Sequence, residues 1–172
     1  MANSVNSLQD KWPDRYIGLL ACGVRVGQWA RGTFYLESHI IGDPTLRFEN
    51  AESVEGFNEA MTLRARDDKY WLNTLRKSDY PDIQAYALRC LSENRYRDIV
   101  PLLVSTFRES PYGTVRMECL KLLSSKHAPE FAELLPVALK DDYELVRRMA
   151  ANYIGRCGDD ALIAADVEAV VN

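Results

Sequence analysis

Three segments of the chain share one pattern of apolar residues, and this repeat limits the possible fold more than any other feature. Residues 69–97, 98–126 and 129–158 each contain an apolar run, a polar turn with Pro or Asp, and a second apolar run at helical spacing. Equivalent positions recur after 31 or 32 residues: Leu75, Phe107 and Leu139; Ile83, Val115 and Val146; Ala87, Cys119 and Ala150; Leu91, Leu123 and Ile154. Two helices joined by a turn and repeated at this interval are typical of an α-solenoid, in which each helical pair buries its apolar face on the next.

The turns of this repeat resemble those of HEAT repeats, in which an acidic or Pro-containing turn is followed by Val-Arg and small apolar residues. The matching stretches are Lys140-Asp141-Asp142 with Leu145-Val146-Arg147, and Ser110-Pro111 with Thr114-Val115-Arg116. The first turn, at residues 78–83, departs from the pattern because Gln84 stands where the Arg is expected. The resemblance covers residues 68–158. It implies an all-α fold, a right-handed HEAT/armadillo-like superhelix of about three helical hairpins.

A repeat array needs covered ends, and the sequence offers a helix for each. Residues 53–67 predict a helix with Ser53 as its N-cap, and residues 161–172 predict a final helix or half repeat. We therefore expect an N-terminal appendage over residues 1–52 and a repeat domain over residues 53–172.

Residues 1–13 are polar and predict a lead-in without regular structure, whereas residues 14–35 predict a helix. Gly18, Gly23, Gly27 and Gly32 each weaken that helix by about 1 kcal/mol relative to Ala. The expected use of these glycines is close approach to a neighbouring segment, or a break near Gly23 to Gly27.

Residues 39–48 predict extended chain around a tight turn, because Pro44 moves Asp43 away from helical geometry. The sequence Gly-Asp-Pro-Thr-Leu-Arg-Phe resembles the C-terminal edge of caspase-like cysteine peptidase domains of the gingipain type, over residues 14–48 at most. In that family the catalytic Cys-His pair lies upstream of this edge. The resemblance therefore implies a non-catalytic C-terminal fragment of a larger peptidase-like protein.

Charge and composition weigh against several classes of protein. The chain has 21 Lys and Arg against 25 Asp and Glu, and a net charge of −4 argues against a general nucleic-acid binder. No apolar run is long enough to span a membrane, and no signal-peptide pattern begins the chain. The four cysteines, Cys22, Cys90, Cys119 and Cys157, form no CxxC pair, so we expect buried thiols and a cytoplasmic location.

No spacing in the sequence points to catalysis, a cofactor or a metal. His39 and His127 have no Cys, Asp or His at ligand distance in the sequence. The acidic pairs at residues 67–68, 141–142 and 159–160 fall where helices should begin, and carboxylates there satisfy backbone N–H groups. We therefore expect a protein that is not an enzyme.

The candidate partner-binding residues recur with the repeat. A tyrosine occupies each inter-helix turn, and basic residues occupy equivalent helical positions: Tyr80, Tyr112, Tyr143, Arg89, Arg116, Lys121, Arg147 and Arg148. Each tyrosine either forms part of an exposed binding edge or packs on the neighbouring turn for stability. Arg116 and Arg147 either bond to adjacent repeats or belong to a positive stripe that binds an acidic peptide or a phosphate backbone. The favoured interpretation is a non-catalytic protein-protein interaction module, and the alternatives are a nucleic-acid-binding HEAT-like protein or the peptidase-like fragment.

Overall fold

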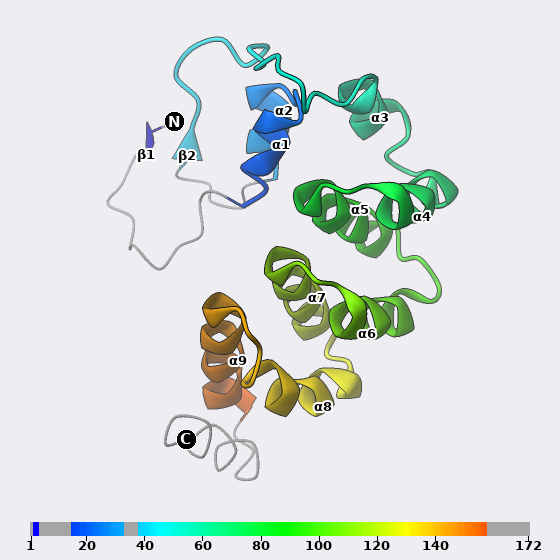
Figure 1. Ribbon diagram of the computed structural model, residues 1–172, viewed down its shortest axis with the longest axis vertical. Helices are drawn as coiled ribbons and strands as arrows, with labels where there is room; N and C mark the ends of the chain where they lie inside the picture. The colour runs from blue at the N-terminus through cyan, green and yellow to red at the C-terminus, as the bar shows by residue number, and fades with distance from the viewer. Residues whose placement is uncertain (1, 4–14, 33–37, 158–172) are drawn as a thin grey trace. The chain divides into compact units, whose positions relative to one another are not determined.

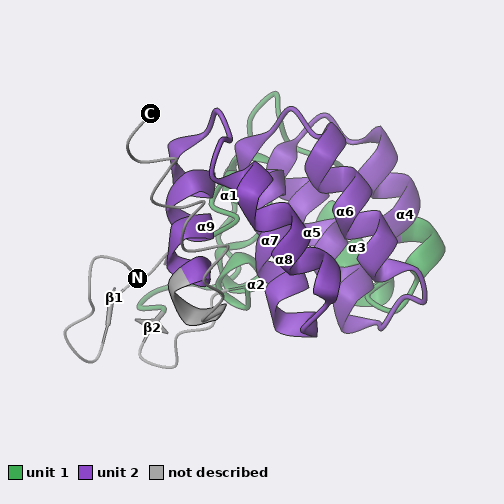
Figure 2. Cartoon of the chain, turned by 90° about the horizontal axis from the view of Figure 1, so that it is seen from below, with its two compact units in different colours: residues 1–70 green, residues 71–172 purple. Residues whose placement is uncertain are grey.

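Helices carry almost all of the regular secondary structure in the part of the chain that the computed structural model describes, residues 2–3, 15–32 and 38–157. The expected lead-in is therefore outside the described residues from residue 4 onward, and the expected helix at 161–172 is wholly outside them. Contacts divide the chain into unit 1, Met1–Tyr70, and unit 2, Trp71–Asn172 (Figure 2). Among the described residues, no helix is long and apolar enough to cross a membrane. The all-α class is confirmed.

In its described residues, unit 1 contains three short helices and one pair of two-residue strands. The helices are α1 (Gly18–Ala21), α2 (Val26–Ala30) and α3 (Phe57–Leu63). The strand β1 (Ala2–Asn3) pairs antiparallel with β2 (Ser38–His39). The chain then turns at Asp43, whose carboxylate accepts the backbone N–H and the hydroxyl of Thr45 at 2.8 and 2.7 Å. This is the tight turn that the sequence predicts.

The single helix expected over residues 14–35 is broken at Gly23. Gly23 has a φ of +81°, and the N–H of Val24 bonds the carbonyl of Leu19 at 3.0 Å, which closes α1 with a Schellman motif. A Cβ at Gly23 would lie 3.0 Å from the Ser53 hydroxyl oxygen, and one at Gly27 would lie 2.9 Å from Pro44. The glycines thus serve both expected uses, a break and a close approach.

The break is held by one buried polar side chain, Asn58 of α3. Its side-chain oxygen accepts the backbone N–H of Arg25 at 2.8 Å, and its amide nitrogen donates to the carbonyl of Gly23 at 2.7 Å. These two bonds satisfy backbone groups that the interrupted helix leaves open. Asn58 is 5% exposed, so leaving either group unpaired would be costly.

The expected N-cap at Ser53 is wrong. α3 begins at Phe57 after Gly56, whose φ of +70° makes a left-handed turn, and the Ser53 hydroxyl instead accepts the N–H of Asn50 at 3.1 Å. By contacts α3 belongs to unit 1, whereas the sequence predicts it as part of the repeat domain over residues 53–172. The domain boundary after residue 52 stays a prediction.

Unit 2 is a series of helices joined by short turns (Figure 1). α4 (Asp68–Lys77), which begins at the end of unit 1, is followed by α5 (Pro81–Glu93), α6 (Ile99–Glu109), α7 (Gly113–Lys126), α8 (Pro129–Ala138) and α9 (Glu144–Cys157). α5 packs on α7 and α7 on α9, while α6 covers α7 and α8 covers α9. We call α5, α7 and α9 the inner helices and α4, α6 and α8 the outer helices.

The repeated apolar positions form the core of unit 2. Every member of the four equivalent sets found in the sequence is at most 8% exposed, and Val115, Cys119 and Leu123 of α7 are fully buried. Burying one of the larger members, a Val, Leu, Ile or Phe side chain, stabilises a fold by about 1.5–3 kcal/mol, so these sets contribute substantially to the stability of unit 2.

The inner helices α5 and α7 both end at a non-glycine residue with positive φ. Arg95 (φ 60°) follows α5 and His127 (φ 51°) follows α7, 32 residues later. Arg95 donates its N–H to the carbonyl of Ser92 at 3.1 Å, and Tyr96 donates to Leu91 at 2.9 Å, the two bonds of a Schellman motif. Glycine is the usual residue at this position because a side chain destabilises the left-handed conformation by about 1–2 kcal/mol.

We predict that Arg95→Gly stabilises the protein by about 0.5–1 kcal/mol, because the relief of left-handed strain exceeds the added entropy of the unfolded chain. Urea unfolding followed by circular dichroism measures this change. Arg97→Gly is the control, since Arg97 is exposed and does not have positive φ, and it should not stabilise. Equal effects of both substitutions would contradict the assignment.

Candidate functional site

The turns that join α4 to α5, α6 to α7 and α8 to α9, residues 78–80, 110–112 and 141–143, have the same local hydrogen bonds. We call the surface that they form the turn edge. At the first position of each turn a side-chain oxygen accepts the backbone N–H two residues later. Ser78 accepts from Tyr80 at 3.2 Å, Ser110 from Tyr112 at 3.2 Å and Asp141 from Tyr143 at 2.8 Å. Each turn is thus closed before the inner helix starts.

A second bond repeats with the same register. The side chain at the fourth position of each inner helix donates to the carbonyl six residues earlier, at the first position of the turn. The donors are Gln84 to Ser78 at 2.6 Å, Arg116 to Ser110 at 2.8 Å and Arg147 to Asp141 at 2.6 Å. Gln84, which departs from the HEAT-like pattern, therefore makes the same bond as the two arginines.

Arg116 also joins one turn to the next. Its guanidinium donates to both carboxylate oxygens of Asp141, each at 2.6 Å, and the two side chains are 14% and 7% exposed. The hydrogen bond to Asp141 raises the pKa of the Arg116 guanidinium. A two-bond pair of this kind fixes geometry as well as charge, so the second and third turns are held at a defined spacing.

Two of the tyrosines lie on the preceding turn. The Tyr112 hydroxyl donates to the carbonyl of Asp79 at 3.3 Å. A Cβ built on Gly113 would lie 2.2 Å from the Tyr143 ring, so this ring covers the bare Cα of Gly113 at the start of α7. Tyr80 is half-buried in the first turn. Tyr112 and Tyr143 thus link successive turns, although 38% of Tyr143 stays exposed.

The remaining basic candidates lie apart from the turn edge. Arg89 in α5 pairs with Glu93 at 2.6 Å, and Lys121 is half-buried in α7. Arg148 in α9 is exposed and lies 3.9 Å from Glu144. The structure therefore brings Tyr80, Tyr112, Tyr143, Arg116 and Arg147 to one edge, and it does not bring Arg89, Lys121 and Arg148 there.

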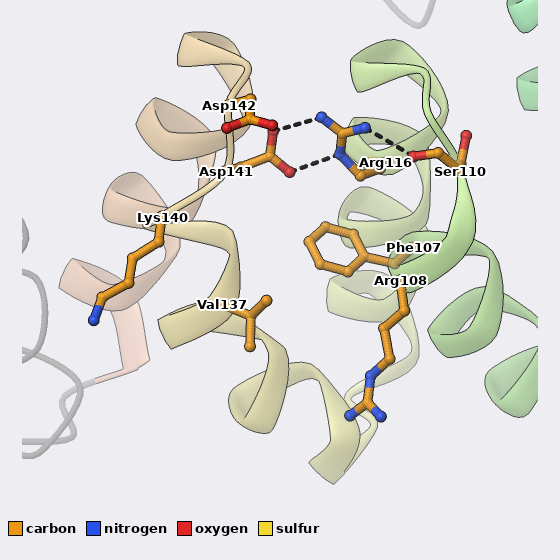
Figure 3. A pocket seen from close by; sticks show the side chains of 8 residues that line it. All are labelled: Phe107, Arg108, Ser110, Arg116, Val137, Lys140, Asp141 and Asp142. Carbon is orange, nitrogen blue, oxygen red and sulfur yellow. Dashed lines mark hydrogen bonds and ion pairs between the residues drawn. The ribbon is translucent and has the colours of Figure 1, made fainter.

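An open groove of about 320 Å³ lies on the turn edge, between the C-terminal ends of α6 and α8 (Figure 3). We call it the edge groove. Its lining residues are Phe107, Arg108, Ser110, Arg116, Val137, Lys140, Asp141 and Asp142. Phe107 is buried at its base, Val137 is 55% exposed, and Arg108 and Lys140 are exposed. In Figure 3 the Arg116–Asp141 pair closes one end of the groove, and Val137 lies away from that pair.

Arg108, Val137 and Lys140 were not among the candidates predicted from the sequence. The sequence does contain a pattern that could have identified Arg108 and Lys140. Each directly follows a member of one repeated apolar set, Phe107 or Leu139. No pattern marked Val137, because an exposed apolar residue on an outer helix looks like a core residue in the sequence.

The three cysteines whose side chains are described are buried thiols, and burial keeps two of them, Cys90 and Cys119, protonated. Cys22, Cys90 and Cys119 are buried and form no disulfide, which confirms the expected buried thiols at these positions. Burial raises the pKa of the Cys90 thiol to about 12 and that of Cys119 well above its usual value. Both thiols therefore stay protonated near neutral pH, which makes them poor nucleophiles. The described residues contain no group of three metal-binding side chains.

Comparison of the chain with protein-family models, with curated proteins and with solved structures finds no match.

We predict that Gly113→Ala destabilises the protein by about 1–3 kcal/mol, because the new methyl group would overlap the Tyr143 ring. Without that ring Ala would be favoured in a helix by up to about 1 kcal/mol. Tyr143→Ala should therefore rescue Gly113→Ala in thermal unfolding of the double variant. A Gly113→Ala protein that is more stable than the wild type would show that the ring does not lie there.

The ion pair between Arg116 and Asp141 can be removed with residue types that occur at the equivalent positions of other repeats. Arg116→Gln and Asp141→Ser place the residue types of Gln84 and Ser110 at these positions, so each local turn bond is kept and only the ion pair is lost. The double-mutant cycle should give a coupling energy of about 1–2 kcal/mol in urea unfolding. Additive single effects would contradict the cross-turn ion pair.

Proposed function

We propose that the protein is a non-catalytic protein-protein interaction module built from about three HEAT-like repeats in a right-handed superhelix. The repeat architecture is supported by the two hydrogen bonds that recur in all three turns at the same positions. It is also supported by the series of inner helices, in which α7 packs on both α5 and α9. Such arrays typically present extended surfaces to partner proteins.

The edge groove is the observation that carries the interaction proposal. It combines a half-exposed apolar side chain, Val137, with two exposed cations, on turns that the Arg116–Asp141 pair holds in place. A concave site with an apolar base and a few polar groups at its margin is typical of binding surfaces. Because the surrounding turns are already ordered by their own hydrogen bonds, a partner would lose little free energy in ordering them.

Nucleic-acid binding is the weaker alternative. Its evidence was the set of repeated basic residues, yet Arg89, Arg116 and Arg148 each face a carboxylate, of Glu93, Asp141 and Glu144. A phosphate backbone would have to compete with these internal pairs.

A second candidate function is that the chain is the C-terminal, non-catalytic part of a larger peptidase-like protein. One observation favours it. Ile41, Leu46 and Phe48, within and beside the Gly-Asp-Pro turn, are 80%, 54% and 52% exposed. Neighbouring exposed apolar side chains of this size mark surfaces that other protein residues cover. In this alternative, the rest of the peptidase-like domain would cover them.

We further place the protein in a reducing compartment such as the cytoplasm. The support is that Cys22, Cys90 and Cys119 form no disulfide and are buried as small apolar side chains.

Site-specific photo-crosslinking in a lysate of the native host tests the proposed function. A photoreactive amino acid replaces Val137 in one variant of the full chain, Phe48 in a second and Leu63 in a third. Leu63 is the control because it is an exposed apolar residue of α3, 82% exposed, outside both surfaces. We expect discrete protein adducts at position 137 that are absent at position 63, with unchanged thermal unfolding of each variant.

Three other outcomes would favour the alternative or contradict the proposed function. Adducts at position 48 without adducts at 137 would favour the peptidase-like candidate. Absence of adducts at both positions would contradict an interaction module. A catalytic activity abolished by one substitution on the turn edge would contradict the non-catalytic assignment.

A further inference from the structure

A cation follows a buried apolar residue at the C-terminal end of each outer helix, within α4 and α6 and just after the end of α8. Arg76, Arg108 and Lys140 come directly after Leu75, Phe107 and Leu139, and successive members are 32 residues apart. All three cations are exposed. We call them the basic ladder. Within the described residues, none of the three is part of an ion pair, in contrast to Arg89, Arg116 and Arg148.

The residues of the basic ladder lie beside turns that are linked to one another by side-chain bonds. The Tyr112 hydroxyl bonds the first turn at Asp79, and the Arg116–Asp141 pair joins the second turn to the third. The outer helices α6 and α8 are in contact. Since packed helices lie about 8–10 Å apart, the backbone positions of Arg108 and Lys140 should be separated by about that distance. Arg76 holds the equivalent position in the preceding repeat, 32 residues before Arg108.

This spacing matches one backbone conformation. A polyproline II segment rises about 3.1 Å per residue with three residues per turn, so every third side chain lies on the same face at about 9 Å intervals. A β-strand does not match, because its side chains alternate and successive third residues face opposite sides. A helix presents side chains on one face at steps of about 5–6 Å or, for residues seven apart, about 10.5 Å, and these steps are respectively shorter and longer than that of the ladder.

We propose that the basic ladder binds an acidic segment of a partner protein in polyproline II conformation, with Asp or Glu at every third residue. This inference rests on the proposed function and names its partner chemistry. Of the two residues between the carboxylates that face Arg108 and Lys140, one lies on the adjacent face of the segment, and its apolar side chain enters the edge groove beside Val137 and Phe107. Exposed cations give such a surface its charge complementarity and its rate of association.

The carboxylates near the ladder limit what it binds. Asp141 is fully engaged by Arg116 and by the N–H of Tyr143, so it does not compete for Arg108 or Lys140. Asp142 lines the groove and is exposed, and its charge opposes an acidic segment at that end. Replacing Asp142 by Asn should therefore strengthen binding.

The same cations also have a local role, because positive charge near a helix C-terminus stabilises the helix. The local role acts on each helix separately, so its loss lowers the free energy of unfolding. The proposed role acts on binding, so its loss lowers the affinity for a regularly spaced acidic segment. Both are measured on the same variants.

The test is fluorescence anisotropy of the full chain with labelled peptides. In the probe, glutamate occupies every third residue between prolines, and leucine replaces one proline between the second and third glutamates. We expect Arg108→Glu combined with Lys140→Glu to weaken binding about tenfold or more. Arg95→Glu combined with Arg97→Glu is the matched control, with the same charge change at exposed residues beyond the opposite end of α5, and should have little effect.

Two further variants test the register. Asp142→Asn should tighten binding of the probe about two- to threefold, since one repulsive charge is removed. Arg76→Glu should weaken a peptide with three glutamates and leave a peptide with only the two glutamates for Arg108 and Lys140 unchanged.

The inference is overturned if a peptide of the same composition with irregular glutamate spacing binds equally well, since general charge attraction would then explain the affinity. It is also overturned if an oligonucleotide displaces the peptide at physiological salt. If the wild type binds no probe while crosslinks at position 137 persist, the acidic-segment inference fails and the proposed function stands. If both are absent, both fail.

Discussion

The burial of α7 between α5 and α9 is the packing interaction on which unit 2 depends. α7 contacts both of its inner neighbours and two of the outer helices, α6 and α8. Its buried residues are spread around its circumference rather than along one stripe, as expected of a helix covered on several sides. A single helical pair has no other way to cover its apolar face, so each pair becomes stable only through the next.

This dependence explains why the turns are so regular. The inner helices stack in register only if each starts at the same height, and the start is set in the turn by the side chain at position 78, 110 or 141. The bond from Gln84, Arg116 or Arg147 back to the same position then fixes the direction in which the helix leaves the turn. The edge groove and the basic ladder follow from this regularity, because equal turns place equivalent surface residues at equal spacing.

Unit 1 is organised by backbone requirements rather than by a repeat. The break at Gly23 needs a positive φ, and its open backbone groups are satisfied by a side chain from α3, Asn58. The sequence predicted where the chain could break, since glycine alone adopts this conformation without strain. It did not predict Asn58, because the contact joins residues more than thirty positions apart. Ser53 was a reasonable N-cap by residue type, but the left-handed turn at Gly56 starts the helix later.

The sequence by itself determined the helical class and the buried positions of unit 2, because apolar residues at helical spacing lie on one face of a helix, and that face is buried. It also located all three turns and their tyrosines. Only the tertiary structure decided which basic residues are engaged. Arg116 meets Asp141 from the next turn, whereas Arg108 and Lys140 remain exposed beside Val137. These residues look alike in the sequence, since charge and spacing do not specify which carboxylate a folded chain brings within hydrogen-bond distance. That choice depends on how successive helical pairs stack, which is a property of the whole array.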